Sequence, residues 1–244
     1  MSALLKVKGL GKRFGGFVAL DGVDLDVAAG ERLGLIGPNG SGKSTLVNCL
    51  CGTLTHETGT VTFEGRLLNG LPAHVRTRVG LARSFQLPRP FASMSVADNV
   101  KMPLLYAIDR RVHGRLTTAQ TEERCEELMR LVGLSDCARK FPRELTQVDM
   151  RKLELARAMG AGPKLLIADE AMAGLSHSEV TEIVSLLIRL NESGVTVILI
   201  EHIMRAVMHF SQRLVVLVSG RKIADGRPEE VIRDAEVERA YLGQ

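Results

Sequence analysis

The chain has 244 residues, of which 45% are hydrophobic and 4% aromatic, and it carries a formal net charge of +4. This length and apolar content allow a sizeable core, built as one large domain or two small ones. The mild positive charge is too weak to indicate nucleic acid as a partner, and no apolar run approaches the ~20 residues that span a bilayer.

The N-terminus lacks an apolar segment followed by a cleavage site, so we expect no signal peptide. The cysteines show neither metal-binding nor redox spacing and lie at Cys49, Cys51, Cys125 and Cys137. Reduced thiols are the simplest interpretation of such cysteines, and they favour a cytosolic protein.

Short strands dominate the first part of the chain. Residues 4–8, 23–27 and 60–64 alternate between apolar and polar, with a turn at Gly15-Gly16 between the first two. This alternation predicts an antiparallel layer. Short apolar runs predict further strands at residues 32–36 and 79–84.

The middle of the chain, residues 93–160, is helical in character. Ser95 is a suitable N-cap for one helix, and Gly133 is a suitable end for another. The expected helices cover residues 96–100, 118–131 and 150–159.

From residue 164 onward, apolar runs alternate with helical patterns. This rhythm is typical of a parallel sheet with crossover helices, so the predicted fold class is α/β. The expected strands cover residues 164–168, 195–200 and 214–218, and the expected helices cover residues 178–190 and 203–210.

One motif in this chain has a specific chemical meaning. Between the predicted strand 32–36 and a predicted helix 44–51, the sequence reads G-x-x-x-x-G-K-[ST]. In such a loop, backbone N–H groups surround phosphates, the lysine reaches the β- and γ-phosphates, and the hydroxyl holds Mg²⁺. A glycine-rich turn without ligand is the alternative, which the flanking strand and helix disfavour. The candidate residues for ATP and Mg²⁺ are Gly37, Pro38, Asn39, Gly40, Ser41, Gly42, Lys43, Ser44 and Thr45.

Two later strands end in residues that suit the same site. The run 164–168 is followed by Asp169 and Glu170, and the run 195–200 leads to His202. Parallel strands present their carboxyl ends to ligands. Asp169 is expected to hold Mg²⁺, Glu170 to polarise the attacking water, and His202 to approach the γ-phosphate. Taken alone, each strand end is more often structural.

The order of these motifs resembles that of ABC-type ATPases over essentially the whole chain. The resemblance implies a phosphate-loop NTPase (RecA-like) core, an antiparallel β-subdomain and an inserted helical subdomain. It also implies that Phe14 stacks on adenine, and that Gln86 contributes to catalysis and to metal binding. The implied parts of this single domain are a nucleotide-binding core at 1–86 and 160–220, a helical subdomain at 87–159 and a C-terminal tail at 221–244.

Four segments resemble the ATP-binding subunits of branched-chain amino-acid importers: Ala82–Gln86, Met94–Val100, Leu199–Met204 and Ala240–Gly243. The resemblance implies ATP hydrolysis at the inner face of the cell membrane by a cytoplasmic, peripheral subunit. Its implied partners are membrane permease subunits, a second ABC ATPase and, indirectly, an external solute-binding protein. Two alternatives stay open: a soluble ABC ATPase of repair or translation, and a regulatory nucleotide-binding module with weak turnover.

The segment aligned with the family's Leu-Ser-Gly-Gly-Gln signature departs from it. In the family this segment contacts ATP held by the opposite protomer. Here Val148 replaces a glycine, and Asp149 adds a negative charge near a phosphate. These changes favour a paralogous partner ATPase over an identical copy. The aligned residues are Leu145, Thr146, Gln147, Val148 and Asp149.

Overall fold

The computed structural model describes residues 3–85, 88–106 and 116–242. A four-stranded antiparallel sheet has the order β2-β1-β4-β5, and a larger six-stranded sheet has the order β10-β9-β3-β8-β7-β6. The strands of the first are β1 (Ala3–Phe14), β2 (Phe17–Ala28), β4 (Thr58–Phe63) and β5 (Arg66–Leu67). Those of the second are β3 (Arg32–Ile36), β6 (Leu81–Ser84), β7 (Leu165–Asp169), β8 (Thr196–Ile200), β9 (Arg213–Val218) and β10 (Arg221–Gly226).

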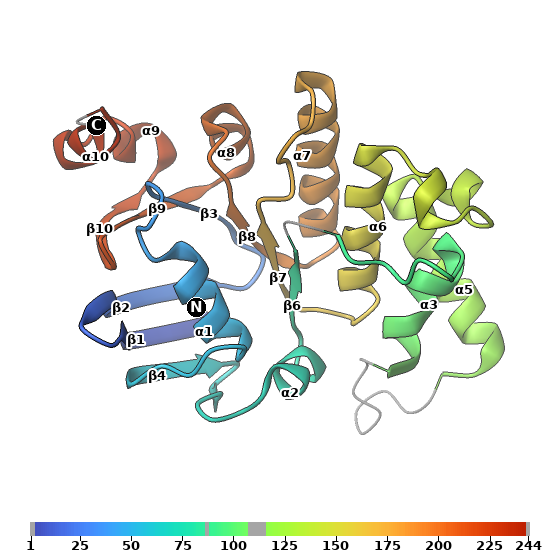
Figure 1. Ribbon diagram of the computed structural model, residues 1–244, viewed down its shortest axis with the longest axis horizontal. Helices are drawn as coiled ribbons and strands as arrows, with labels where there is room; N and C mark the ends of the chain where they lie inside the picture. The colour runs from blue at the N-terminus through green and yellow to red at the C-terminus, as the bar shows by residue number, and fades with distance from the viewer. Residues whose placement is uncertain (1–2, 86–87, 107–115, 243–244) are drawn as a thin grey trace.

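Helices cover both faces of the larger sheet and extend beyond one of its ends (Figure 1). They are α1 (Lys43–Cys51), α2 (Ala73–Arg78), α3 (Val96–Tyr106), α5 (Thr118–Val132), α6 (Gln147–Met159), α7 (His177–Glu192), α8 (Met204–Phe210), α9 (Pro228–Val231) and α10 (Ala235–Leu242). Among the described residues, no helix is both long enough and apolar enough to cross a membrane.

Alternation along the central strands divides the core into layers. On β7, Leu166 and Ala168 pack with α3, α5, α6 and α7. Leu165 and Ile167 point to the other face and pack with α1 and the antiparallel sheet. Successive side chains of a strand point to opposite faces, so a continuous apolar run is what a doubly covered strand needs. The predicted α/β fold, with its antiparallel layer, is confirmed by this arrangement.

Two predicted helices have different bounds in the structure. The helix predicted for 150–159 begins at Gln147, because the Thr146 side chain accepts a hydrogen bond from the Asp149 N–H and caps it. The helix predicted for 96–100 continues to Tyr106, through Pro103. Three residues of the signature segment therefore belong to the first turn of α6.

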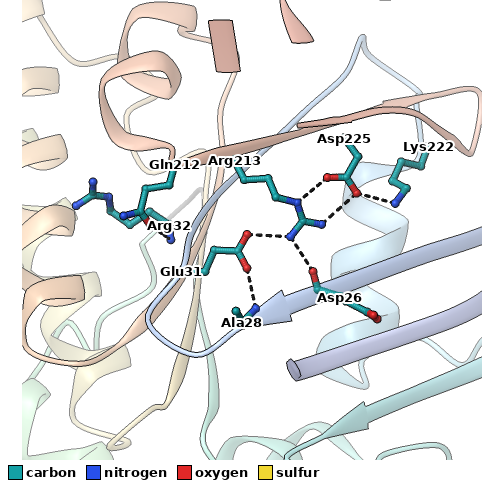
Figure 2. Close-up of polar contacts among 8 residues, drawn as sticks. All are labelled: Asp26, Ala28, Glu31, Arg32, Gln212, Arg213, Lys222 and Asp225. Atoms are coloured by element: carbon teal, nitrogen blue, oxygen red, sulfur yellow. Dashed lines mark hydrogen bonds and ion pairs between the residues drawn. The ribbon is translucent and has the colours of Figure 1, made fainter. Parts of the chain in front are cut away.

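The C-terminal tail expected at residues 221–244 contains a further strand, because residues 221–226 form β10, antiparallel to β9. Its side chains are exposed or half-buried, so the sequence carries no apolar alternation there. Polar contacts attach this edge (Figure 2), in addition to the half-buried Ile223 and Ala224, which pack against a small buried cluster. Arg213 donates two hydrogen bonds to Asp225, at 2.6 and 3.0 Å, and one to Glu31 at 2.8 Å. The Lys222 ammonium adds a contact of 2.7 Å to Asp225.

We expect Arg213→Met to lower the free energy of unfolding by about 1–3 kcal/mol, between the values for exposed and buried ion pairs, because the Arg213 side chain is 29% exposed. Urea unfolding measures the effect, with the exposed Arg189→Met as a matched control. Burial opposes ionisation of Asp225, but hydrogen bonds from Arg213 and Lys222 outweigh it and lower the pKa of Asp225.

The stabilisation is therefore present above the ordinary aspartate pKa of about 3.9 and is lost as the pH falls through the lowered value. The difference between Arg213→Met and wild type should shrink over that acidic range. An unchanged difference would assign the stabilisation to another contact.

Candidate nucleotide site

The predicted phosphate loop lies between β3 and α1 (Figure 1). Gly40 and Gly42 have φ angles of 78° and 103°, which side-chain-bearing residues rarely adopt. A Cβ at Gly37 would lie 2.1 Å from the Leu217 carbonyl oxygen, and one at Gly42 would lie 2.6 Å from that of Ala19. The loop therefore needs glycine both for its turn and for its close packing against neighbouring backbone.

The first turn of α1 is suited to an anion. No side chain caps this helix, and its first turn contains no acidic residue. Its leading N–H groups and helix dipole are therefore available to a phosphate. These features fit a nucleotide and go beyond what a plain glycine turn requires.

Lys43 extends back over the loop. Its ammonium donates to the carbonyl oxygens of Gly37 and Pro38, at 2.7 and 3.0 Å. Burial lowers the pKa of Lys43, and the charges of Glu170 and Asp169 oppose this shift. The charges of both carboxylates therefore act on this lysine.

The end of β7 carries a strained backbone. Glu170 has a φ of 47°, and its N–H donates to the Ile200 carbonyl oxygen at 2.9 Å. Left-handed backbone at a residue with a side chain costs of order 1–3 kcal/mol and gathers at functional sites. The hydrogen bond to β8 keeps Glu170 in this conformation, directly after Asp169.

Sequence reasoning missed the partner of Asp169. Arg83, on the neighbouring strand β6, donates to Asp169 Oδ2 at 2.5 Å and to Asn48 Oδ1 at 2.7 Å. An arginine within the predicted strand 79–84 was the available signal. Arg83 therefore links β7 to α1, and its hydrogen bond occupies one oxygen of the Asp169 carboxylate.

The available ligands suit Mg²⁺ bound largely through a nucleotide. Ser44 is exposed and Asp169 lies at the sheet edge. Among the described residues, no group of three or more histidine, cysteine or acidic side chains forms a metal site of its own. Mg²⁺ commonly takes one or two protein oxygens together with phosphate oxygens and water. Gln86, the third predicted metal residue, lies outside the described residues.

Phe14 and His202 are both accessible. Phe14 ends β1 at the hairpin tip and is 49% exposed, so it is not part of the core. The Lys12 ammonium lies 5.2 Å from its ring centre. The His202 side chain is 69% exposed, directly after a glutamate whose side chain is fully buried. That glutamate, Glu201, was not predicted as part of the site.

The signature segment is more ordered than its departures suggest. Thr146 also donates from its hydroxyl to Asp149 at 2.7 Å, and the Lys152 ammonium lies 3.4 Å from that carboxylate. Val148 is half-buried and packs against the helical core, as does Leu145. Part of the charge and bulk that the sequence predicted to face a phosphate is therefore taken up within α6.

Helix α6 also holds the segment that follows β6. Arg157 donates to the Arg89 carbonyl oxygen at 3.0 Å, and its guanidinium lies 5.4 Å from the centre of the Phe91 ring. Glu154 accepts from Arg157 at 2.9 Å, and burial raises its pKa. One helix thus connects the signature segment with residues on the far side of Gln86.

The cysteines take no part in these contacts. All four are free, and three are buried. Burial raises the pKa of Cys49 to about 11 and that of Cys51 to about 12, which leaves both thiols protonated near neutral pH. Their position inside α1 is structural.

Comparison with known proteins places this geometry in a family. A family model described as ABC transporter matches residues 20–173. The chain is 38% identical to the high-affinity branched-chain amino acid transport ATP-binding protein LivG of Salmonella typhimurium, over 99% of this chain and 98% of the relative. It is 35% identical to BraF of Pseudomonas aeruginosa, a protein of the same description, with the same coverage. The lipopolysaccharide export system ATP-binding protein LptB of Escherichia coli is 31% identical, also over 99% of this chain and 98% of the relative.

Solved structures agree with the sequence comparison. A nucleotide-free ATP-binding cassette of an ABC transporter superposes with a TM-score of 0.87 at 30% identity, over 99% of this chain and all of that one. A dimeric cassette with bound ADP and Pi superposes with a TM-score of 0.80 at 25% identity, over 92% of this chain and 98% of that one. The chain therefore belongs to the ABC transporter family, as one of its ATP-binding, ATP-hydrolysing subunits.

Proposed function

We propose that this chain is the ATP-hydrolysing subunit of an importer of branched-chain amino acids. The observation that carries the proposal is one sheet edge where an uncapped helix N-terminus, Lys43 and a carboxylate pair meet. The near full-length similarity to LivG and BraF supports the solute class. We place the subunit in the cytoplasm, on the inner face of the membrane.

Each site residue has a proposed role toward ATP. Phe14 stacks on the adenine, an interaction worth ~1–3 kcal/mol. The loop N–H groups and Lys43 hold the phosphates, and Ser44, Asp169 and Gln86 provide oxygen ligands to Mg²⁺, which neutralises charge on the phosphate oxygens. Glu170 orients the attacking water and accepts its proton, while His202 donates to the γ-phosphate.

The uptake phenotype tests the solute assignment. Deletion of the gene should abolish high-affinity uptake of leucine, isoleucine and valine by the cells. The wild-type gene should restore uptake, and a gene encoding Glu170→Gln should not. Normal uptake of all three amino acids in the deletion strain, with loss of uptake of another solute, would overturn the branched-chain assignment.

We further propose a second, paralogous ATPase as the partner, with each ATP held between one chain's phosphate loop and the other chain's signature segment. Val148 and Asp149 still differ from the family pattern, although Lys152 offsets part of the Asp149 charge at 3.4 Å. A carboxylate near a γ-phosphate costs on the order of 1 kcal/mol in water and about 4 kcal/mol at an effective dielectric of 20. This chain's signature segment would then bind its partner's ATP weakly, whereas its own phosphate loop would bind ATP tightly.

The permease is proposed to dock beside the segment after β6. A groove of about 240 Å³ lies there, and its lining includes Leu81, Ala82 and Ala158 together with Arg83, Glu154 and Arg157. The exposed rings of Phe85 and Phe91 belong to the same region, where exposed aromatics favour a protein interface. Because α6 contacts this region and begins within the signature segment, it would carry motion between the permease and the ATP site.

We expect Phe91→Ala to lower leucine transport at least 5-fold while the basal ATP hydrolysis of the isolated subunit changes less than 2-fold, since truncating a well-packed interface aromatic costs about 1 kcal/mol or more. Phe17→Ala is the matched control, because Phe17 is an exposed phenylalanine at the hairpin tip of the antiparallel sheet. Equal losses of transport and basal hydrolysis would place the role of Phe91 in the ATP site instead.

A further inference from the structure

We propose that Glu201 is a positioning residue for ATP hydrolysis: its carboxyl group and the His202 ring share one proton, so that Nε2 of His202 always keeps a hydrogen to donate. This inference rests on the proposed role of His202 toward the γ-phosphate. Glu201 lies next to the nucleotide site, and the role proposed for it requires no contact with phosphate.

The Glu201 side chain is buried. Glu201 follows β8 directly and is 2% exposed. One oxygen, Oε1, accepts a hydrogen bond from the Met172 N–H at 2.8 Å. The other oxygen, Oε2, is buried and has no hydrogen-bond partner among the residues that the structure describes. Leaving a buried carboxylate oxygen unpaired is costly, so this atom requires a partner in the working state.

The ring of the next residue is a candidate partner, beside the His202 backbone N–H and the Arg151 guanidinium, which both act on this carboxyl group. Nδ1 of His202 lies 3.8 Å from Oε2, beyond hydrogen-bond length, and the ring is largely exposed and able to turn. A rotation that shortens this contact would satisfy Oε2. It would also fix the direction in which Nε2 points, in the way that second partners orient catalytic histidines.

Whether the shared proton lies on Nδ1 of His202 or on Oε2 of Glu201, Nε2 of His202 carries a hydrogen. If the proton lies on Nδ1, the ring is an imidazolium beside a carboxylate, and Nε2–H is a donor. If it lies on Oε2, the carboxylic acid donates to Nδ1, and the neutral ring again carries its hydrogen on Nε2. Burial raises the pKa of Glu201, which makes the second position accessible.

The same carboxyl group also touches the backbone that follows the proposed water-positioning residue. Met172 lies two residues after Glu170, and the Glu170 N–H itself bonds to the end of β8. Arg151 of α6 donates to the Ala173 carbonyl oxygen at 2.9 Å. Glu201 therefore positions both His202 and the backbone that follows Glu170. That backbone contacts α6, the helix that begins within the signature segment.

A double-mutant cycle on the reconstituted complex tests the proposal. Glu201→Leu should lower kcat about 10- to 100-fold with KM for ATP changed less than 3-fold, the range found for outer partners of metal-ligating histidines. In a His202→Ala background, Glu201→Leu should change kcat less than 2-fold, because its effect acts through the ring. Glu201→Gln should stay within about 5-fold of wild type, since its amide can donate to Nδ1 and still accept from Met172.

A spectroscopic readout separates this role from a general loss of structure. In wild-type protein, ¹⁵N NMR of His202 should show a protonated Nε2, and Glu201→Gln should keep it. A neutral ring protonated only on Nδ1 in wild type would overturn the proposal, as would additive losses in the cycle. If His202→Ala leaves hydrolysis unchanged, the role of His202 falls and this inference with it. If only Glu201→Leu is without effect, the inference alone fails.

Discussion

Glu170→Gln is expected to lower ATP turnover by about 10²- to 10⁴-fold and to leave ATP affinity unchanged within about 3-fold. The amide cannot accept the proton of the attacking water, and a positioned general base contributes an effect of this size. Glu170 directly follows Asp169, the carboxylate proposed to hold Mg²⁺. Its backbone has an unusual φ of 47°, which sets the direction of the Glu170 side chain. Phosphate release measures turnover, and a fluorescent ATP analogue measures binding.

Glu192→Gln is the matched control, because Glu192 is an exposed glutamate at the end of α7, and it should turn over ATP like wild type. The Glu170→Gln protein also tests the partner. With ATP, light scattering should show this variant as a monomer alone and as a dimer only with the paralogous ATPase. A stable homodimer would contradict the paralogue proposal, whereas wild-type turnover would remove Glu170 from the mechanism.

Lys43→Ala is expected to weaken ATP binding about 10- to 150-fold, which corresponds to the ~1.5–3 kcal/mol of a hydrogen bond to a charged group. In the structure this ammonium donates to the carbonyl oxygens of Gly37 and Pro38, so it lies at the phosphate loop. Isothermal titration with ATP and Mg²⁺ measures the change.

Lys8→Ala, which removes an exposed lysine from β1, should bind ATP with wild-type affinity. Thermal unfolding of both variants without nucleotide identifies any loss that arises from loop stability. Unchanged affinity in Lys43→Ala would mean that the loop N–H groups and Mg²⁺ hold the phosphates without the lysine.

Local patterns allowed the centre of the site to be predicted from sequence. The phosphate loop carries its chemistry within nine consecutive residues, and the short apolar run before Asp169 favours a buried strand in a covered sheet. Such features need no knowledge of distant partners. The predicted α/β fold and its antiparallel layer follow from the same kind of local periodicity.

Features that depend on distant partners could not be predicted in this way. Arg83 meets Asp169, 86 positions later, and Arg213 meets Glu31, 182 positions earlier. Strand β10 has no fully buried face, and antiparallel pairing with β9, the half-buried Ile223 and the Arg213–Asp225 ion pair attach it to the sheet. Glu201 was recognisable as a residue of the segment beside His202, but its burial follows only from the packing of β8 among its neighbours.

The start of α6 shows a third case. Thr146 has the side chain of a good N-cap, and it also aligns with the serine of the family's Leu-Ser-Gly-Gly-Gln signature. The structure gives this hydroxyl both to the helix and to Asp149. Thr146 therefore fits both the family signature and an N-cap. Its capping hydrogen bond determines where α6 begins.

The central claim, that ATP hydrolysis by this chain drives amino-acid uptake, is tested most directly in liposomes holding the complete complex with its permease, partner ATPase and solute-binding protein. Labelled leucine uptake and phosphate release are measured in the same sample. We predict that leucine accumulates only when ATP is on the side that carries this chain, and that Glu170→Gln lowers uptake and phosphate release together. ATP consumption without leucine accumulation, or accumulation without ATP, would contradict the account.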